Sequence, residues 1–315
     1  MEKKTLSTVG IEYDSLGIRA AKITSSVTGR EINYVLENLQ EVKGDFDKET
    51  ELVAGLKKIK DRIGAGTRDN IVTCVAGKQV YAAQISFKRL PEAEMKSALK
   101  FEIRKDVPFD TASSAIDYQI LDSSEQQDDK LNILVTVVAN SLLNKHLAAL
   151  SKAGVRPWIV DVLPLAVINA FWAGERDQVN MDPRVVLHFA PDVCTLVIDG
   201  NAVPLYTRSI YFAAEEMYGA AGKGVTEQER IRRITTLGNE LRRSLSYYEK
   251  TYGVSNFGAL YLIGDYIYSP ELHGGIAEKV GLELSGSTLL EKLGVKTNAP
   301  LGKFDVAIAL AMRRE

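Results

Sequence analysis

Residues 9–23 have the sequence VGIEYDSLGIRAAKI, and this stretch decides how the chain begins to fold. Apolar and polar residues alternate on both sides of the turn-forming DSLG, which predicts antiparallel strands at 8–13 and 17–24. A run of the same kind at 31–42 predicts a third antiparallel strand.

A helix and a buried strand are predicted to follow these three strands. Leu52, Leu56 and Ile59 share one helical face, and the helix should end near the glycine-containing stretch at 64–66. The β-branched run IVTCVAG at 71–77 is typical of a buried strand. The chain therefore opens with the order strand, strand, strand, helix, strand.

The next part of the chain, residues 82–155, is predicted to form a small inserted α+β unit. Met95, Leu99 and Ile103 recur four residues apart between two prolines, which predicts an amphipathic helix. The remaining elements of the unit are strand 115–122, polar loop 123–130, strand 131–139 and helix 141–153. The two strands and their loop predict a hairpin with a solvated tip.

The second half of the chain repeats the opening order. Residues 185–210 contain three strand-like runs separated by turns at 191–192 and 199–201. Thr226 and Glu229 form a capping box, which predicts the start of a long helix. Its buried stripe is expected to comprise Ile231, Ile234, Gly238, Leu241, Leu245 and Tyr248, and its solvated face Arg232, Arg233, Arg242 and Arg243. A strand at 258–264 and helices at 270–280 and 305–313 complete the chain.

Length and composition favour a soluble protein with two lobes. The 315 residues exceed one ordinary core, and a formal net charge of -2 gives no attraction for nucleic acid. Cys74 and Cys194 lie in apolar runs, which favours buried thiols in a reducing compartment. His146, His188 and His273 lack the spacing of a metal site. The sequence also lacks a secretory signal and any apolar run near the roughly 20 residues of a membrane span, so we expect a cytoplasmic protein.

Five motifs carry a resemblance to a known family. They are VGIEYDSLGIRAAKI (9–23), LPEAEMKSALKFEIRKDVPFDTASSAIDYQIL (90–121), GVRPWIVDVLPLAVINAF (154–171), ELRRSLSYYEKTYG (240–253) and FDVAIALAMRR (304–314). Together they resemble the type IV pilus assembly protein PilM family. That family is itself similar to the cell division protein FtsA and to the cytoplasmic part of the type II secretion protein GspL.

The resemblance implies an α/β fold of the actin-like, ribonuclease H-like kind. Two duplicated βββαβ lobes would flank a cleft, and a small α+β subdomain would be inserted in the first lobe. The first lobe would comprise residues 1–81, 156–182 and 301–315, the insertion residues 82–155, and the second lobe residues 183–300, including the long helix 226–252.

The resemblance also implies a partner. In the family, the cytoplasmic N-terminal peptide of a PilN-like inner-membrane protein is gripped between the first subdomain and the insertion. By this analogy the protein is a cytoplasmic scaffold of a type IV pilus or related secretion machine, held at the inner membrane through that partner. Val107, Pro108 and Phe109 would form one wall of the peptide groove, and Arg104 would bond the backbone or acidic groups of the peptide. Alternatively, the VPF segment ends the helix and packs inward. A homo-oligomer, including a filament like that of actin or FtsA, is left open.

The first nucleotide turn of the family is altered in this chain. The family pattern D-I-G-S-x-x-V-K uses bare backbone amides, a hydroxyl and a lysine to hold phosphate. The corresponding residues here are Glu12, Tyr13, Asp14, Ser15 and Arg19, so that a carboxylate replaces the glycine. A carboxylate about 4 Å from a phosphate oxygen costs on the order of 4 kcal/mol at an effective dielectric of about 20.

The other two nucleotide motifs are altered as well. In the second turn His188 replaces an aspartate and Ala190 replaces a glycine, while the adenosine-side motif keeps only Gly264 of three glycines. These changes predict a degenerate site without a catalytic residue, and neither ATP nor Mg²⁺ is expected as a cofactor. The alternative is an ATP-binding, weakly hydrolysing actin-like ATPase of the same assembly system. A kinase-like enzyme is disfavoured because its phosphate turns would keep their glycines.

Overall fold

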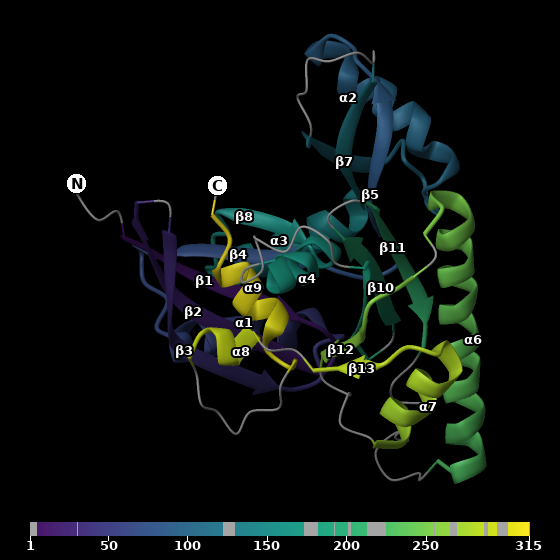
Figure 1. The fold of residues 1–315 in the computed structure, drawn as a ribbon. Coiled ribbons are helices and arrows are strands. Elements are labelled where there is room, and N and C mark those ends of the chain that lie inside the picture. The colour runs from purple at the N-terminus through teal and green to yellow at the C-terminus, as the bar shows by residue number, and fades with distance from the viewer. Residues whose placement is uncertain are drawn as a thin grey trace.

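The computed structural model describes residues 5–29, 31–121, 130–172, 182–191, 193–200, 203–212, 225–254, 256–264, 270–286, 289–294 and 302–314. Two five-stranded sheets form the body of the molecule. A third, three-stranded sheet belongs to a unit that projects from this body (Figure 1). The molecule is therefore a mixed α/β protein. We call each five-stranded sheet with the helices packed on it a lobe, and the projecting unit the insertion.

The first sheet has the strand order β3-β2-β1-β4-β8. Its strands are β1 (Thr5–Tyr13), β2 (Gly17–Thr28), β3 (Glu31–Lys43), β4 (Asn70–Val75) and β8 (Ile159–Val162). The first three strands pair antiparallel, as predicted, and β4 and β8 pair parallel. The predicted helix is α1 (Glu49–Ile63), which ends at Gly64 in the left-handed conformation that favours glycine.

Helix α3 (Asn140–Lys152) packs with the first lobe. Its Ala149 and Leu150 lie in the same buried cluster as Leu56 and Ile59 of α1. We predicted this helix as the last element of the insertion. In the structure its apolar face packs against the first sheet. The domain limits stay predictions, but this packing joins α3 to the body of the molecule.

The second sheet has the order β11-β10-β9-β12-β13 and repeats the arrangement of the first. Its strands are β9 (Arg184–Phe189), β10 (Val193–Gly200), β11 (Val203–Tyr211), β12 (Leu260–Gly264) and β13 (Leu284–Ser285). Helices α6 (Glu227–Tyr252) and α7 (Pro270–Val280) pack with this sheet, whereas α8 (Leu289–Lys292) contributes Leu289 and Leu290 to the core between the two large sheets. The second sheet and its helices therefore follow the same element order as the first sheet.

Helix α6 begins and ends where its sequence indicates. Thr226 caps its N-terminus by accepting a hydrogen bond from the Glu229 amide (3.3 Å), and Gly253 closes its C-terminus with a φ of 69°. One prediction is wrong: Ile231 is 57% exposed, because the core against which α6 packs begins only at Ile234. The predicted arginine face is largely exposed to solvent.

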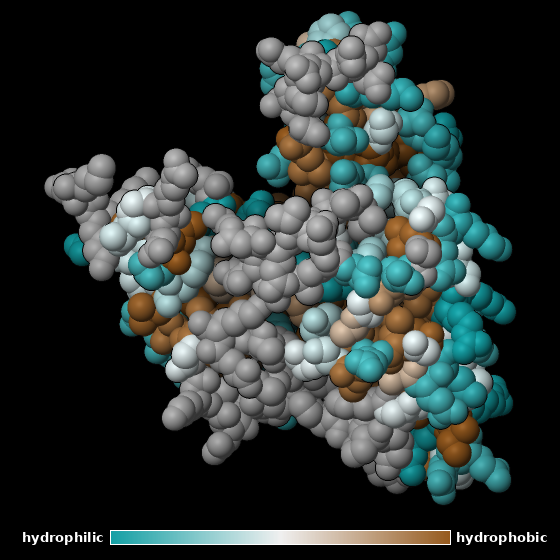
Figure 2. All heavy atoms as spheres, viewed as in Figure 1, coloured by the Kyte–Doolittle hydropathy of each residue, from teal (hydrophilic) through white to brown (hydrophobic). Residues whose placement is uncertain are grey.

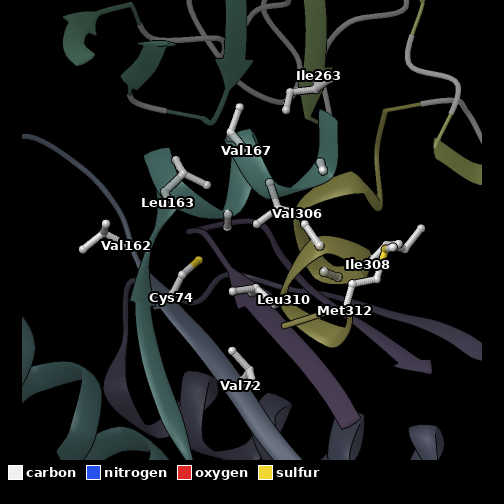
Figure 3. Close-up of a cluster of buried hydrophobic side chains, with 14 of the residues drawn as sticks. Val72, Cys74, Val162, Leu163, Val167, Ile263, Val306, Ile308, Leu310 and Met312 are labelled. Atoms are coloured by element: carbon white, nitrogen blue, oxygen red, sulfur yellow. The ribbon is translucent and has the colours of Figure 1, made fainter. Parts of the chain in front are cut away.

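One hydrophobic core joins the two lobes. Helices α4 (Leu163–Trp172) and α9 (Asp305–Ala311) lie between the sheets and contribute Val167 and Ile308 to it (Figure 3). Strand β1 approaches α9 so closely that a Cβ at Gly10 would stand 2.0 Å from the Ala307 carbonyl oxygen. Glycine at this position allows the backbone contact.

The insertion consists of a sheet of order β5-β7-β6 covered by a helix. Its elements are β5 (Val80–Lys88), α2 (Glu92–Glu102), a 3₁₀ turn (Ile103–Lys105), β6 (Ser114–Ile120) and β7 (Lys130–Ala139). The hairpin of β6 and β7 is confirmed, whereas most of its predicted solvated tip lies outside the described residues. Strand β5 contacts the second lobe, since the Thr207 hydroxyl donates to the Ala82 carbonyl oxygen (2.6 Å).

Candidate functional site

The turn between β1 and β2 is closed by its own aspartate. The amides of Leu16 and Gly17 both donate to Oδ1 of Asp14, each at 2.8 Å. The Asp14 amide in turn donates to the Gly17 carbonyl oxygen at 2.9 Å. The carbonyl oxygen of Ser15 accepts from the Phe46 amide (2.7 Å), which holds the turn against the segment after β3. The backbone donors at the tip of this turn therefore already face a carboxylate.

Arg19 joins the two carboxylates of this turn. Its Nη2 lies 2.6 Å from Oδ2 of Asp14, and its Nη1 lies 3.6 Å from Oε1 of Glu12. Arg19 is only 2% exposed and Glu12 only 6% exposed. Buried ions of this kind are stable only when they are paired. Glu12, Asp14 and Arg19 therefore form one buried ionic cluster, which we call the turn cluster.

The second lobe brings His188 toward the turn cluster. Burial, together with the charge of Arg19, lowers the pKa of His188 to about 3. The Nδ1 atom of His188 is buried and has no hydrogen-bond partner in the part of the chain that the structure describes. His188 is therefore a neutral side chain beside a buried guanidinium, where the family pattern has an aspartate.

The remaining predicted nucleotide residues have backbone roles. The Ala190 amide donates to the Val193 carbonyl oxygen (3.1 Å) within its own hairpin. Gly264 has a φ of 102°, and a Cβ there would stand 2.3 Å from the Phe189 carbonyl oxygen. The chain therefore needs glycine at this position for packing alone. In the described ranges no cluster of histidine, cysteine or acidic residues could hold a metal ion.

A groove of about 440 Å³ separates the insertion from the first lobe. It is bordered by β6 and β8, each of which is the edge strand of its sheet, and we call it the β6/β8 groove. Ile116 of β6, Leu147 of α3 and Val160 of β8 are among its lining residues. Figure 2 shows hydrophobic side chains gathered at the base of the projecting insertion.

One buried acid lines the β6/β8 groove. Asp161 is 6% exposed, and burial raises the pKa of its carboxyl although Arg313 opposes the shift. Its Oδ1 accepts from the Val162 amide (2.8 Å), and its Oδ2 lies 3.7 Å from Nε of Arg313. The opposite wall carries Asp117, whose side chain is 79% exposed and lies 3.3 Å from the Lys96 ammonium.

A second cavity of about 690 Å³ lies between the insertion and the second lobe. Its lining includes Tyr81, Tyr206, Tyr247 and Tyr252. Burial, followed by the charge of Asp106, raises the pKa of Tyr81 above its usual value. The cavity is aromatic and carries charges of both signs.

The predicted groove residues do not lie together on one open surface. Arg104 and Pro108 are exposed, Phe109 is half-buried, and Val107 is buried with the core residues of the small sheet. Pro108 lines the tyrosine cavity. No sequence pattern indicated that β6 and β8 border a groove. The signal that could have done so is an acid inside an apolar run, WIVDVL at 158–163.

Two sheets of identical strand order that share one core define this protein as actin-like. A family model of the type IV pilus assembly protein PilM matches residues 10–210. The chain belongs to this family, and the predicted resemblance is confirmed.

Among three similar solved structures, the first two agree with this fold. A PilM–PilN type IV pilus biogenesis complex is 20% identical, with 97% of each chain covered and a TM-score of 0.78. The ethanolamine utilization protein EutJ from Carboxydothermus hydrogenoformans is 10% identical over 99% of this chain and 91% of that chain, with a TM-score of 0.51. The cytoplasmic domain of EpsL, an inner-membrane component of the type II secretion system of Vibrio cholerae, is 10% identical over 93% and 97% of the two chains, with a TM-score of 0.46. Within the described residues, no helix combines the length and apolarity of a membrane span.

Proposed function

We propose that this protein is a cytoplasmic scaffold of a type IV pilus or related secretion machine. It binds the cytoplasmic N-terminal peptide of a PilN-like inner-membrane protein and is held at the membrane through that peptide. Membership of the PilM family supports the first part, and the solved complex of a similar protein with PilN supports the second. The observation that carries the proposal is the β6/β8 groove with its two sheet edges.

Edge strands bind extended peptides because their outer backbone groups have no neighbouring strand. Strand β6 pairs with β7 on one side, and in the described part of the chain no strand pairs with its other side. With seven residues, it is long enough to pair with a short peptide, whereas β8 has only four. We therefore place the peptide against β6, with its alternate side chains directed into the apolar lining.

The β6/β8 groove fits this role better than the segment 104–109. Val107 of that segment is 7% exposed and contributes to the core of the insertion, so its side chain is not available to a partner. Leu147, in contrast, lines the groove and is 38% exposed. We assign the segment 104–109 to the support of the small sheet.

The scaffold function requires no nucleotide. We propose that the cleft binds neither ATP nor Mg²⁺ with useful affinity, since the donors of the first turn already face Asp14. A penalty of about 4 kcal/mol for a nearby carboxylate reduces a micromolar affinity to about millimolar.

The experiment is a calorimetric titration of the full chain with the N-terminal peptide of the PilN-like protein. It is repeated with L147R, which places a charge in the groove, and with V35R, which places the same charge at an exposed apolar site that does not line the groove. We expect L147R to weaken binding at least about tenfold, while V35R binds like the wild type. Absence of wild-type binding at high peptide concentration, or equal binding by both variants, would overturn the proposal.

A further inference from the structure

We infer that the β1–β2 turn is an anion site whose anion is built into the chain. The Asp14 carboxylate occupies the place at the turn where a phosphate group would sit, and it holds that place permanently. This inference rests on the proposed loss of nucleotide binding and gives its cause. To bind at this turn, a nucleotide phosphate would have to displace the Asp14 carboxylate, which belongs to the same chain.

The contacts of Asp14 are those of a bound oxyanion. One oxygen accepts from two successive amides, Leu16 and Gly17, and the other accepts from a guanidinium. Amides at a turn together with an arginine are the donors that proteins use for phosphate groups. Each oxygen is within 2.8 Å of its donors, so the two amides and Nη2 of Arg19 already have an acceptor.

The position of Arg19 explains why the internal anion is held firmly. The guanidinium is enclosed by Glu12 and Asp14 in the first lobe and lies near enough to His188 of the second lobe to affect its pKa. Release of Asp14 from the turn would leave a buried cation with one fewer carboxylate. The turn cluster therefore stabilises the closed turn and takes a place between the lobes that a nucleotide would otherwise take.

Two explanations of a weak nucleotide site are separable. Asp14 could exclude phosphate by charge alone, or it could exclude phosphate by occupying the turn amides. Asparagine keeps an oxygen that accepts from Leu16 and Gly17 but removes the charge. Glycine removes both the charge and the acceptor, and it matches the family pattern at this position. Only the occupancy explanation predicts different behaviour for the two variants.

The test is a calorimetric titration of the full-length wild type, D14G and D14N with Mg²⁺-ATP and, separately, with pyrophosphate. We expect D14G to bind both at least about tenfold more tightly than the wild type and D14N to remain as weak as the wild type. No gain in folded D14G would overturn the inference while leaving the scaffold proposal intact, and so would an equal gain in D14N. Tight ATP binding by the wild type would overturn both the inference and the proposed loss of nucleotide binding, whereas the peptide titration tests the scaffold separately.

A second measurement needs no variant. Hydrogen exchange of the wild type, followed by NMR, should show slow exchange at the Leu16 and Gly17 amides in the absence of any ligand. Exchange at the rate of an open turn would mean that Asp14 does not occupy these donors. This result would overturn the inference even where D14G fails to fold.

Discussion

The β1–β2 turn is formed where two strands meet, and the β6/β8 groove is formed by the edge strands of two sheets. The two regions differ in whether their backbone polar groups have partners within the chain. At the turn, Asp14 of the same chain accepts hydrogen bonds from the Leu16 and Gly17 amides and from Nη2 of Arg19. At the groove, β6 keeps one edge that pairs with no strand in the described residues. The first region supplies its own acceptor for these donors, whereas the second still offers donors and acceptors to a ligand.

Under the proposed function, this difference explains how an actin-like fold could lose one ligand and keep another. A site gains binding free energy when the ligand replaces water rather than good internal contacts. In this proposal, closure of the turn on Asp14 removes that gain for a phosphate. The groove would retain it for a peptide, and apolar residues such as Leu147 would add burial.

The largest effect is expected from removal of the buried cation. R19A leaves Glu12 and Asp14 without their guanidinium, and loss of one partner of a buried ion pair costs about 3–5 kcal/mol of unfolding free energy. Urea unfolding of wild type and variant measures this difference.

Its matched control is K152A, which removes an ion pair with Glu49 whose side chains are 60% and 49% exposed. Here the loss should stay below about 1 kcal/mol. Similar losses in R19A and K152A would show that the turn cluster is not the buried unit described above.

The next effect concerns pH. The His188 pKa falls to about 3 in the folded protein, whereas an unfolded histidine titrates near its usual value of 6.5. Its folded form is therefore neutral, and its contribution to stability is full above pH 6.5 and is lost as the pH falls toward 3. Between pH 6.5 and 5 the loss amounts to about 1.5–2 kcal/mol for one such group.

The variant H188L removes this titration without breaking a hydrogen bond at Nδ1. Unfolding free energies measured at pH 7 and pH 5 should fall less for H188L than for the wild type. His146 has a pKa lowered to about 4 by burial and remains in both proteins, so part of the acid sensitivity should persist. Identical pH profiles would place His188 in a more polar site than the one observed.

The sequence predicted the elements and their order because these depend on local periodicity. The capping residues of α6 and the hairpin at 9–23 are such local signals, and both are confirmed. The prediction that Ile231 is buried was wrong because the length of the buried stripe depends on where the second sheet ends. Periodicity in the sequence does not report this position.

The site was harder to predict for the same reason. The family resemblance aligned Asp14 with a turn that holds phosphate in the family, and from this we expected repulsion between charges. It did not show that the carboxylate folds back on its own turn, although aspartate commonly does so. The β6/β8 groove depends on how the insertion docks on α3 and β8, a long-range contact that no local pattern in residues 82–155 reveals.

A smaller effect should come from the backbone of the peptide. If the peptide pairs with the outer edge of β6, only every second amide of the peptide donates to that strand. N-methylation of the two alternate amides that donate to β6 should weaken binding by about 10–100-fold, since each lost hydrogen bond is worth about 0.5–1.5 kcal/mol.

The control is the same peptide methylated at the alternate amides that point away from β6. This peptide keeps the amides that donate to the strand. Titrations of the wild-type protein with the two peptides measure the ratio. Equal weakening by the two methylated peptides would show that side chains alone hold the peptide. The edge of β6 would then have no part in binding.

The smallest effect is expected at Asp117, the exposed acid of the groove. Its side chain is 79% exposed and its partner Lys96 is 62% exposed, so the D117N variant should change the unfolding free energy by less than about 0.5 kcal/mol. Its effect on peptide affinity should be modest and should vanish in high salt, because exposed charges are screened. A salt-independent loss of affinity would mean that the bound peptide buries Asp117. The groove would then resemble the turn cluster in relying on a desolvated charge. The unpaired edge of β6 would be the remaining difference between the two regions.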